Sequence, residues 1–182
     1  MTSKQTAQGG TKPSTNTYTL VAKIKPGEIE NLRRVAAAAL EGGKWGAGSD
    51  ALGILHFERF FIINDEYLVF TSEFDGDDDP YLSDFYAGEI TPGPTFGVFN
   101  SAWQYTEGWP GSENRDAFVK FWKDHKVEEL LTYSYFPGVT AKEVRKAVRV
   151  QKAFQNVLDH PDAAAQVFPD ARQNFIHCCC LG

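Results

Sequence analysis

Apolar and polar residues alternate near the start of the chain and then recur at helical spacing. Residues 17–24, TYTLVAKI, alternate and contain β-branched side chains, which is typical of a half-buried strand. After the turn sequence KPGE, the spacing predicts a helix from Glu28 to Leu40, ended by Gly42. The apolar stripe of this helix consists of Ile29, Leu32, Val35, Ala36, Ala39 and Leu40.

Residues 54–63 and 67–75 are predicted to form a β-hairpin. A symmetric turn at Asp65–Glu66 would place Phe57 opposite Phe74 and Phe61 opposite Phe70. One face would then be nearly continuously apolar and should pack on the helices. Arg59 interrupts this face, and we expect it to meet a carboxylate such as Asp84 on the helix side.

The opposite face of the predicted hairpin would carry the candidate chemistry. Glu58 would lie opposite Glu73, and His56 opposite Asp75. Facing carboxylates repel, so they need a cation, a shared proton, a salt-bridge partner or water. The candidate catalytic residues are therefore His56, Glu58, Glu73 and Asp75. A metal ion on His56 and these acids is one alternative, because imidazole and carboxylate suit Zn, Fe(II) or Mn. A solvated or subunit-contacting polar face is the other, so metal and cofactor stay unassigned.

Three further helices and one strand are predicted later in the chain. DDDPYLSDFYAGEI has a capping Asp79 and a first-turn Pro80. A second helix begins near Ser112, and residues 129–136, ELLTYSYF, form the predicted fourth strand. Thr140 and Glu143 make a capping box for the last helix. Its expected inner face consists of Val144, Val148, Gln151, Phe154 and Leu158.

Residues 88–112 are rich in glycine, proline and aromatic side chains. A long loop of this kind is often a lid or a binding loop, although its aromatics could instead pin it to the core. An apolar ligand pocket would be walled by Phe60, Phe99, Trp103, Trp109, Tyr133 and Tyr135.

The order of elements predicts an α+β fold on the ferredoxin-like β-α-β-β-α-β plan. Its antiparallel sheet would carry helices on one face, with an inserted aromatic loop and extra helices. We expect a disordered N-terminal segment at residues 1–16, a ferredoxin-like domain at residues 17–161 and a C-terminal extension at residues 162–182.

Composition narrows the classes of function. The 182 residues carry a net charge of −6 without a basic stripe, which argues against nucleic-acid binding. No stretch is apolar for long enough to span a bilayer, and the N-terminus lacks a signal-peptide pattern, so we expect a cytoplasmic protein. All three cysteines, Cys178, Cys179 and Cys180, lie in the tail. A tail without a dedicated role, prenylation at Cys179 and soft-metal binding remain open for it.

The blocks LHFERFFIINDEYLVFTSEFDGD, YLSDF and YSYFPGVTAKEVR resemble the dimeric α+β barrel superfamily, and within it a poorly characterised bacterial group. The resemblance covers roughly residues 17–158. It implies a homodimer with a pocket between sheet and helices or loops. Members of that superfamily include small monooxygenases, polyketide cyclases and haem enzymes, so the resemblance does not carry one activity.

Two hypotheses about function follow. In the first, the pocket binds an apolar small molecule or converts it in an oxidative or cyclising step, with His56 and nearby carboxylates as acid and base. In the second, the chain is a non-catalytic homodimer whose polar sheet face is buried against its mate. Whether the protein is an enzyme, monooxygenase-like or cyclase-like, is left open by the sequence.

Overall fold

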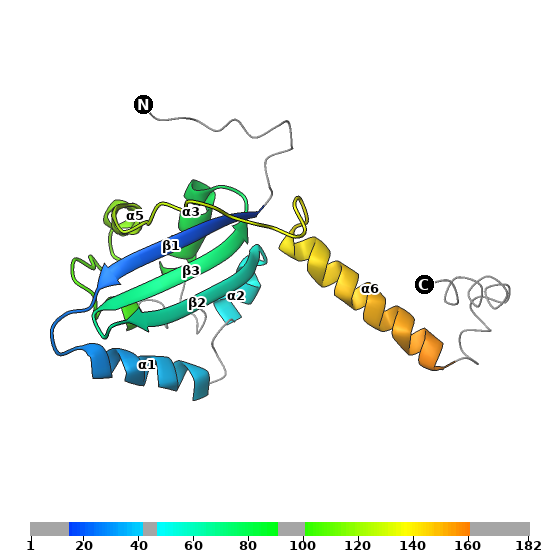
Figure 1. The fold of residues 1–182 in the computed structure, drawn as a ribbon, viewed down its shortest axis with the longest axis horizontal. Coiled ribbons are helices and arrows are strands. Elements are labelled where there is room, and N and C mark those ends of the chain that lie inside the picture. The colour runs from blue at the N-terminus through cyan, green and yellow to red at the C-terminus, as the bar shows by residue number, and fades with distance from the viewer. Residues whose placement is uncertain (1–14, 42–46, 91–100, 161–182) are drawn as a thin grey trace, which may run out of the picture. The chain divides into compact units, whose positions relative to one another are not determined.

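The computed structural model describes residues 15–41, 47–90 and 101–160 (Figure 1). The predicted N-terminal segment, the Cys-rich tail and Phe99 therefore lie wholly or largely outside the described residues. The chain divides into two compact units, Met1–Ala141 and Lys142–Gly182, which are described separately. No helix of the described ranges is both long and apolar enough to cross a membrane.

A three-stranded antiparallel sheet forms the centre of the first unit. Its strands are β1 (Thr15–Lys23), β2 (Leu55–Ile63) and β3 (Tyr67–Asp75), in the order β1-β3-β2. The central β3 contributes Leu68, Phe70 and Phe74 to the core. The first strand and the hairpin were both predicted from alternation, and both are formed.

Helices cover one face of this sheet. They are α1 (Ile29–Glu41), α2 (Ala47–Leu52), α3 (Asp78–Ile90) and α5 (Arg115–Asp124), and Figure 1 shows α3 and α5 behind the sheet. The fold class is thus α+β, and the order β1-α1-β2-β3-α3 follows the ferredoxin-like plan as predicted. The predicted helix stripe of α3 is confirmed, because Leu82 and Phe85 are fully buried and Tyr86 packs at the edge of the core.

Aromatic side chains dominate the core between sheet and helices. Phe70 of β3 lies 5.5 Å from Trp122 of α5 and 6.4 Å from Trp103, measured between ring centroids. Phe74 stacks on Tyr81 at 3.8 Å, and the Tyr81 hydroxyl is 2.7 Å from Ser72 Oγ. Trp103 lies in the described part of the inserted loop, so that part of the loop is pinned to the core by its aromatics.

Backbone hydrogen bonds fix the same loop end to β1. Ile24 forms an isolated bridge with Thr106, and the amide of Lys25 donates to the Tyr105 carbonyl at 2.8 Å. The amide of Glu107 donates to the Lys23 carbonyl, also at 2.8 Å. Of the two roles expected for the aromatic loop, residues 101–109 therefore have the structural one.

The predicted fourth strand at residues 129–136 is wrong: these residues have no strand structure. Residues 125–127 do reach the free edge of β1, where Lys126 bridges Leu20 and the Val127 amide donates to the Thr19 carbonyl. The backbone ladder ends there. Beyond it, the Thr17 and Thr19 hydroxyls donate hydrogen bonds to the Glu129 carboxylate, which are contacts between side chains only. The last helix, α6, spans Ala141–Asp159 and belongs to the second unit beyond its first residue.

The hairpin has a different register from the one predicted. Asn64 and Asp65 both have positive φ, and the Glu66 amide donates to the Ile63 carbonyl, so the connection has three residues, 64–66. Ile63 then pairs with Tyr67 rather than Leu68, a slip of one residue. Because side chains alternate between faces, this slip moves the side chains of β2 from Phe57 to Ile63 to the other face, while β3 keeps its predicted face. Leu55 precedes a bulge in β2 and stays in the core as predicted.

Candidate functional site

The corrected register separates the two glutamates that were expected to face each other. Glu58 pairs with Ser72 and points toward the helices, whereas Glu73 pairs with Phe57 on the outer face. Arg59 also lies on the outer face, 3.9 Å from Glu73, so its predicted contact with Asp84 is not formed. The repulsion between facing carboxylates therefore does not exist in this fold.

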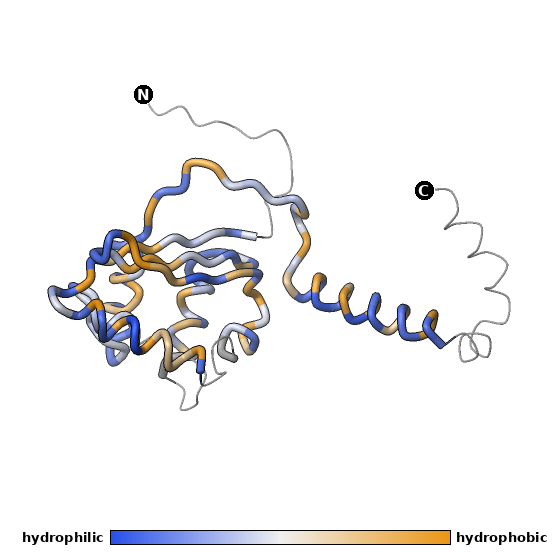
Figure 2. The backbone as a smooth tube through the Cα atoms, turned by 60° about the horizontal axis from the view of Figure 1, so that its bottom comes forward, coloured by the Kyte–Doolittle hydropathy of each residue, from blue (hydrophilic) through white to orange (hydrophobic). Residues whose placement is uncertain are grey.

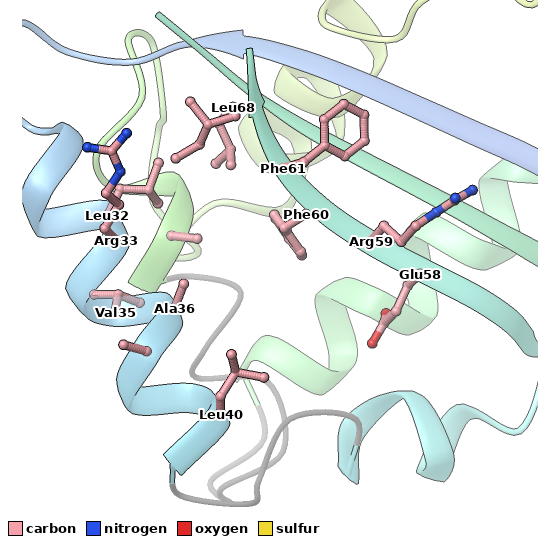
Figure 3. Close-up of a pocket in the computed structure, with 13 residues that line it drawn as sticks. Leu32, Arg33, Val35, Ala36, Leu40, Glu58, Arg59, Phe60, Phe61 and Leu68 are labelled. Atoms are coloured by element: carbon pink, nitrogen blue, oxygen red, sulfur yellow. The ribbon is translucent and has the colours of Figure 1, made fainter. Parts of the chain in front are cut away.

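An apolar cleft lies between α1 and the edge strand β2, with a volume of about 580 Å³. Figure 3 shows Leu32, Val35 and Leu40 of α1 on one side and Phe60 of β2 on the other. Arg33 lies at the rim and pairs with Asp65 at 2.6 Å. The remaining lining residues are Ala36, Ala37, Glu58, Arg59, Phe61, Ile62, Leu68 and Ala102.

Among the described residues, Glu58 is the only carboxyl group in this lining. Its Oε1 accepts a hydrogen bond from the Ser49 hydroxyl of α2, and its Oε2 is buried without a partner among the described residues. Burial raises the pKa of Glu58, and the nearby Asp50 raises it further, while the Ser49 hydrogen bond opposes the shift. A carboxyl group of this kind retains its proton at higher pH than an exposed glutamate, so it is able to donate a proton to a bound molecule.

His56 and Asp75 form a separate pair. A bulge between Leu55 and Phe57 leaves His56 outside the regular pairing, and its Nε2 lies 2.8 Å from Asp75 Oδ1. Asp75 Oδ2 accepts from the Ala141 amide at 2.8 Å. The pair is part-buried, and neither residue lines the cleft. The predicted contact between His56 and Asp75 is thus formed, but not beside Glu58.

The predicted metal site gains no support from the arrangement of the acids. Among the residues the structure describes, no three His, Cys, Asp or Glu side chains are grouped so that they could hold a metal ion. Glu73 is on the other face of the sheet from Glu58, which divides the predicted ligand set.

The predicted aromatic wall is brought together only in part. Phe60 lines the cleft and lies 5.5 Å from Trp103, which is buried behind it. Trp109 packs on Phe121 at 5.0 Å as part of the core. Tyr133 and Tyr135 are 84% and 74% exposed and do not line the cleft, because the strand that would have held them against the sheet is not formed.

Sequence reasoning missed the contribution of α1 and of Ser49. The signal in α1 was a stripe wider than core packing requires: Leu32 and Ala39 are buried, whereas Ala36 and Leu40 on the same stripe stay exposed and line the cleft. Ser49 lay in a glycine-rich stretch interpreted as a connection, and nothing in its sequence marked it as a partner of Glu58.

Comparison with known proteins adds no argument about fold or function. No protein-family model matches the chain, and no curated protein matches it. Among solved structures, the chain is similar to tetracenomycin F2 cyclase from Streptomyces glaucescens, a type-II polyketide cyclase. The two are 19% identical with a TM-score of 0.38, and the match covers 66% of this chain and 99% of the cyclase. A likeness at this level carries no argument about activity.

Proposed function

We propose that this protein binds an apolar small molecule in the cleft between α1 and β2 and supports its cyclising conversion. The observation that carries the proposal is Glu58, the one carboxyl group among the described residues of a mostly apolar lining, whose buried Oε2 has no hydrogen-bond partner among those residues. A large apolar pocket with one convergent polar group of raised pKa is the usual form of a ligand site.

The role proposed for Glu58 is proton transfer. In its protonated form it donates from Oε2 to an oxygen of the bound molecule, and as the carboxylate it takes a proton back. Ser49 holds Oε1 and so orients the carboxyl group. A cyclising step on a carbonyl compound needs such a donor for the developing oxyanion, whereas the apolar walls position the carbon skeleton. Oxidative conversion of the bound molecule in the same cleft is the alternative to the cyclising step.

The size and lining of the cleft support a ligand of several fused or linked rings. A volume of about 580 Å³ lies within the usual range of ligand pockets, roughly 300–1,000 Å³. Its walls combine the aromatic Phe60 with the aliphatic Leu32, Val35 and Leu40, which suits a flat apolar molecule. His56, Glu73 and Asp75 have no role in this version of the site.

We also propose that the chain acts as a cytoplasmic homodimer. The exposed aromatic side chains on the outer sheet face support a homodimer. They do not favour the second hypothesis, a non-catalytic homodimer, because that hypothesis relied on burial of a polar face. The two functions make different demands on the cleft, because only the first needs α1 and β2 to leave it open to a ligand.

The neutral fluorescent dye Nile red serves as a probe for the cleft. Ala36 and Ala38 are both exposed alanines of α1, but only Ala36 lines the cleft. Ala36→Trp should fill the cleft and raise the dissociation constant of Nile red by about tenfold or more, whereas Ala38→Trp should leave it unchanged. Glu58→Gln should retain dye binding, because the substitution keeps the shape of the wall.

Equal effects of the two tryptophan substitutions would place the dye elsewhere on the protein and count against the cleft. Native mass spectrometry of freshly purified protein provides a second measurement, since a ligand retained from the cell should be lost from Ala36→Trp and kept by Ala38→Trp. Conversion is then tested on any ligand so identified, where Glu58→Gln should bind it and fail to convert it.

A further inference from the structure

The outer face of the sheet is unusually apolar for a solvated surface. Phe57, Phe61 and Ile63 of β2 are 66%, 44% and 42% exposed. An antiparallel sheet with helices on one face commonly carries polar side chains on the other. We call this surface the open face; it is formed by Phe57, Arg59, Phe61, Ile63, Tyr67, Thr71 and Glu73, around Val69, which lies on the same face but is buried.

A second exposed apolar surface lies in residues 128–136, here called the arm. Its large apolar side chains are between 64% and 95% exposed, namely Leu130, Leu131, Tyr133, Tyr135 and Phe136. The arm follows Val127, whose amide is bonded to β1, and precedes Ala141, whose amide is bonded to Asp75. Both ends of this connection are thus held on the first unit, while its apolar side chains contact little of it. Soluble monomers rarely expose so many large apolar side chains in succession.

The third surface is one side of α6. Val144, Val148 and Leu158 recur at helical spacing and are exposed, and Figure 2 shows the corresponding orange positions interrupted by hydrophilic ones along this helix. The nineteen residues of α6 rise about 28 Å and the nine residues of β2 extend about 30 Å, so the helix matches the length of the open face.

Charge also distinguishes α6 from the rest of the chain. The helix holds five basic and two acidic residues, a net charge of three positive. The rest of the chain holds thirteen basic and 22 acidic residues, a net charge of nine negative. A basic helix is therefore attracted to the remainder of this chain, or of an identical one, and steered toward it.

We propose that α6 and the arm of one copy cover the open face of a second copy, in a reciprocal exchange about a two-fold axis. Each copy carries the two apolar elements and the surface that receives them. In a pair of copies all of these surfaces are therefore covered, and none is left to bind a third copy. This inference rests on the proposed homodimer and adds which surfaces form it.

Sedimentation of the full chain at a series of concentrations tests whether these surfaces hold a dimer. Val148→Asp in α6 and Phe61→Asp on the open face should each raise the dimer dissociation constant by about a hundredfold, because a carboxylate would be buried without a partner. Ala153→Asp is the matched control: it adds the same charge to α6 on the side away from Val148, four residues from Arg149, and should leave the constant within about threefold. An equal loss of dimer in the control would overturn the proposal.

Crosslinking determines which surfaces meet. With Cys178, Cys179 and Cys180 replaced by Ser, chains carrying Phe61→Cys and chains carrying Val148→Cys are co-expressed under different tags and treated with a short bismaleimide. The proposal expects a crosslink between the two kinds of chain and none when either kind is present alone.

Each other outcome of the crosslinking overturns the exchange. Crosslinks in the Phe61→Cys sample alone would show two open faces in contact, so the homodimer would stand without the exchange. A link within one chain carrying both cysteines, in a monomeric protein, would show α6 on its own sheet, and the homodimer would fail as well. Nile red binding is compared with dimerisation in Val148→Asp, because Val148 does not line the cleft whereas Phe61 does, so ligand binding stands or falls independently of the dimer.

Discussion

Replacing Glu58 by Gln should stabilise the protein at neutral and alkaline pH and leave its stability nearly unchanged in acid. Burial raises the pKa of Glu58 in the folded protein above its ordinary value of 4.5. Between the ordinary and the raised pKa, the folded state therefore binds more protons than the unfolded state. The free energy of unfolding falls as pH rises through this window, and the loss is complete above the raised pKa. Gln has no ionisable proton, so the free energy of unfolding of the variant does not fall in this pH window.

The magnitude follows from the unpaired oxygen. A buried acceptor without a hydrogen bond costs about 1–3 kcal/mol, and more when it is charged. Gln keeps an oxygen that accepts from Ser49, and it places a neutral amide nitrogen where the unpaired Oε2 of Glu58 lies. The substitution thus removes the buried charge but still buries a polar atom. We expect a gain of about 1–2 kcal/mol near pH 8 and less than about 0.5 kcal/mol near pH 4.

Urea denaturation at fixed protein concentration across this pH range measures the effect. Glu73→Gln is the control, because Glu73 lies on the open face, 3.9 Å from Arg59, and is partly exposed. An exposed pair of this kind contributes little, so this substitution should change stability by less than about 0.5 kcal/mol without a pH trend. If the glutamates faced each other, both substitutions would stabilise the protein alike. That result, or a loss of stability in Glu58→Gln near pH 8, would refute the assignment of Glu58 to the cleft.

Two further substitutions test the packing. Phe70→Ala removes a fully buried ring and should lower the free energy of unfolding in urea by about 3–5 kcal/mol. Phe57→Ala should lower it by less than about 1 kcal/mol in dilute protein and by more as the protein concentration rises. Similar losses for the two variants, independent of concentration, would contradict the register of β2. Asn114→Ala removes the side chain that accepts from the Asp116 and Ala117 amides at the start of α5, and should cost about 1 kcal/mol, restored largely by Asn114→Ser. A neutral Asn114→Ala would show that this cap does not stabilise the fold.

The elements that the sequence predicted well are those with one apolar face. In β3, the residues Leu68, Phe70 and Phe74 are apolar and lie in the core, while Thr71 and Glu73 face outward, so only one orientation satisfies the pattern. The same holds for α3. In both cases the period of the apolar residues matches the element that forms, and burial of one side is decisive.

The orientation of β2 could not be decided in this way, because both of its faces are apolar. Phe57, Phe61 and Ile63 alternate with Phe60 and Ile62, and the face with more apolar residues is the one exposed in the structure. The choice depended on the turn. In the sequence IINDEY, a two-residue turn at Asp65–Glu66 and a three-residue connection at residues 64–66 are both plausible, and only the left-handed backbone of Asn64 and Asp65 distinguishes them.

The arm failed as a predicted strand for a different reason. ELLTYSYF has the composition of a strand, but strand propensity depends on a neighbouring edge with which to pair. Backbone bonding to the edge of β1 involves Thr19 and Val21, which pair with residues 125–127, and the arm does not extend this pairing along β1. The cleft was unpredictable because its walls come from two separate elements, α1, which ends at Glu41, and β2, which begins at Leu55, and their approach depends on the register of the hairpin.

The cleft and the open face are two consequences of one register. Turning Glu58, Phe60 and Ile62 toward the helices necessarily turns Phe57, Phe61 and Ile63 outward, because alternate side chains of a strand leave by opposite faces. Exposing two phenylalanines and an isoleucine is unfavourable in an isolated chain. Burial of Phe60 and Ile62 on the helix side offsets only part of this unfavourable free energy. Covering the open face removes that loss. The same second copy that buries these side chains would therefore hold β2 in the register that places Glu58 in the cleft, and the stability of the dimer and the geometry of the site should change together.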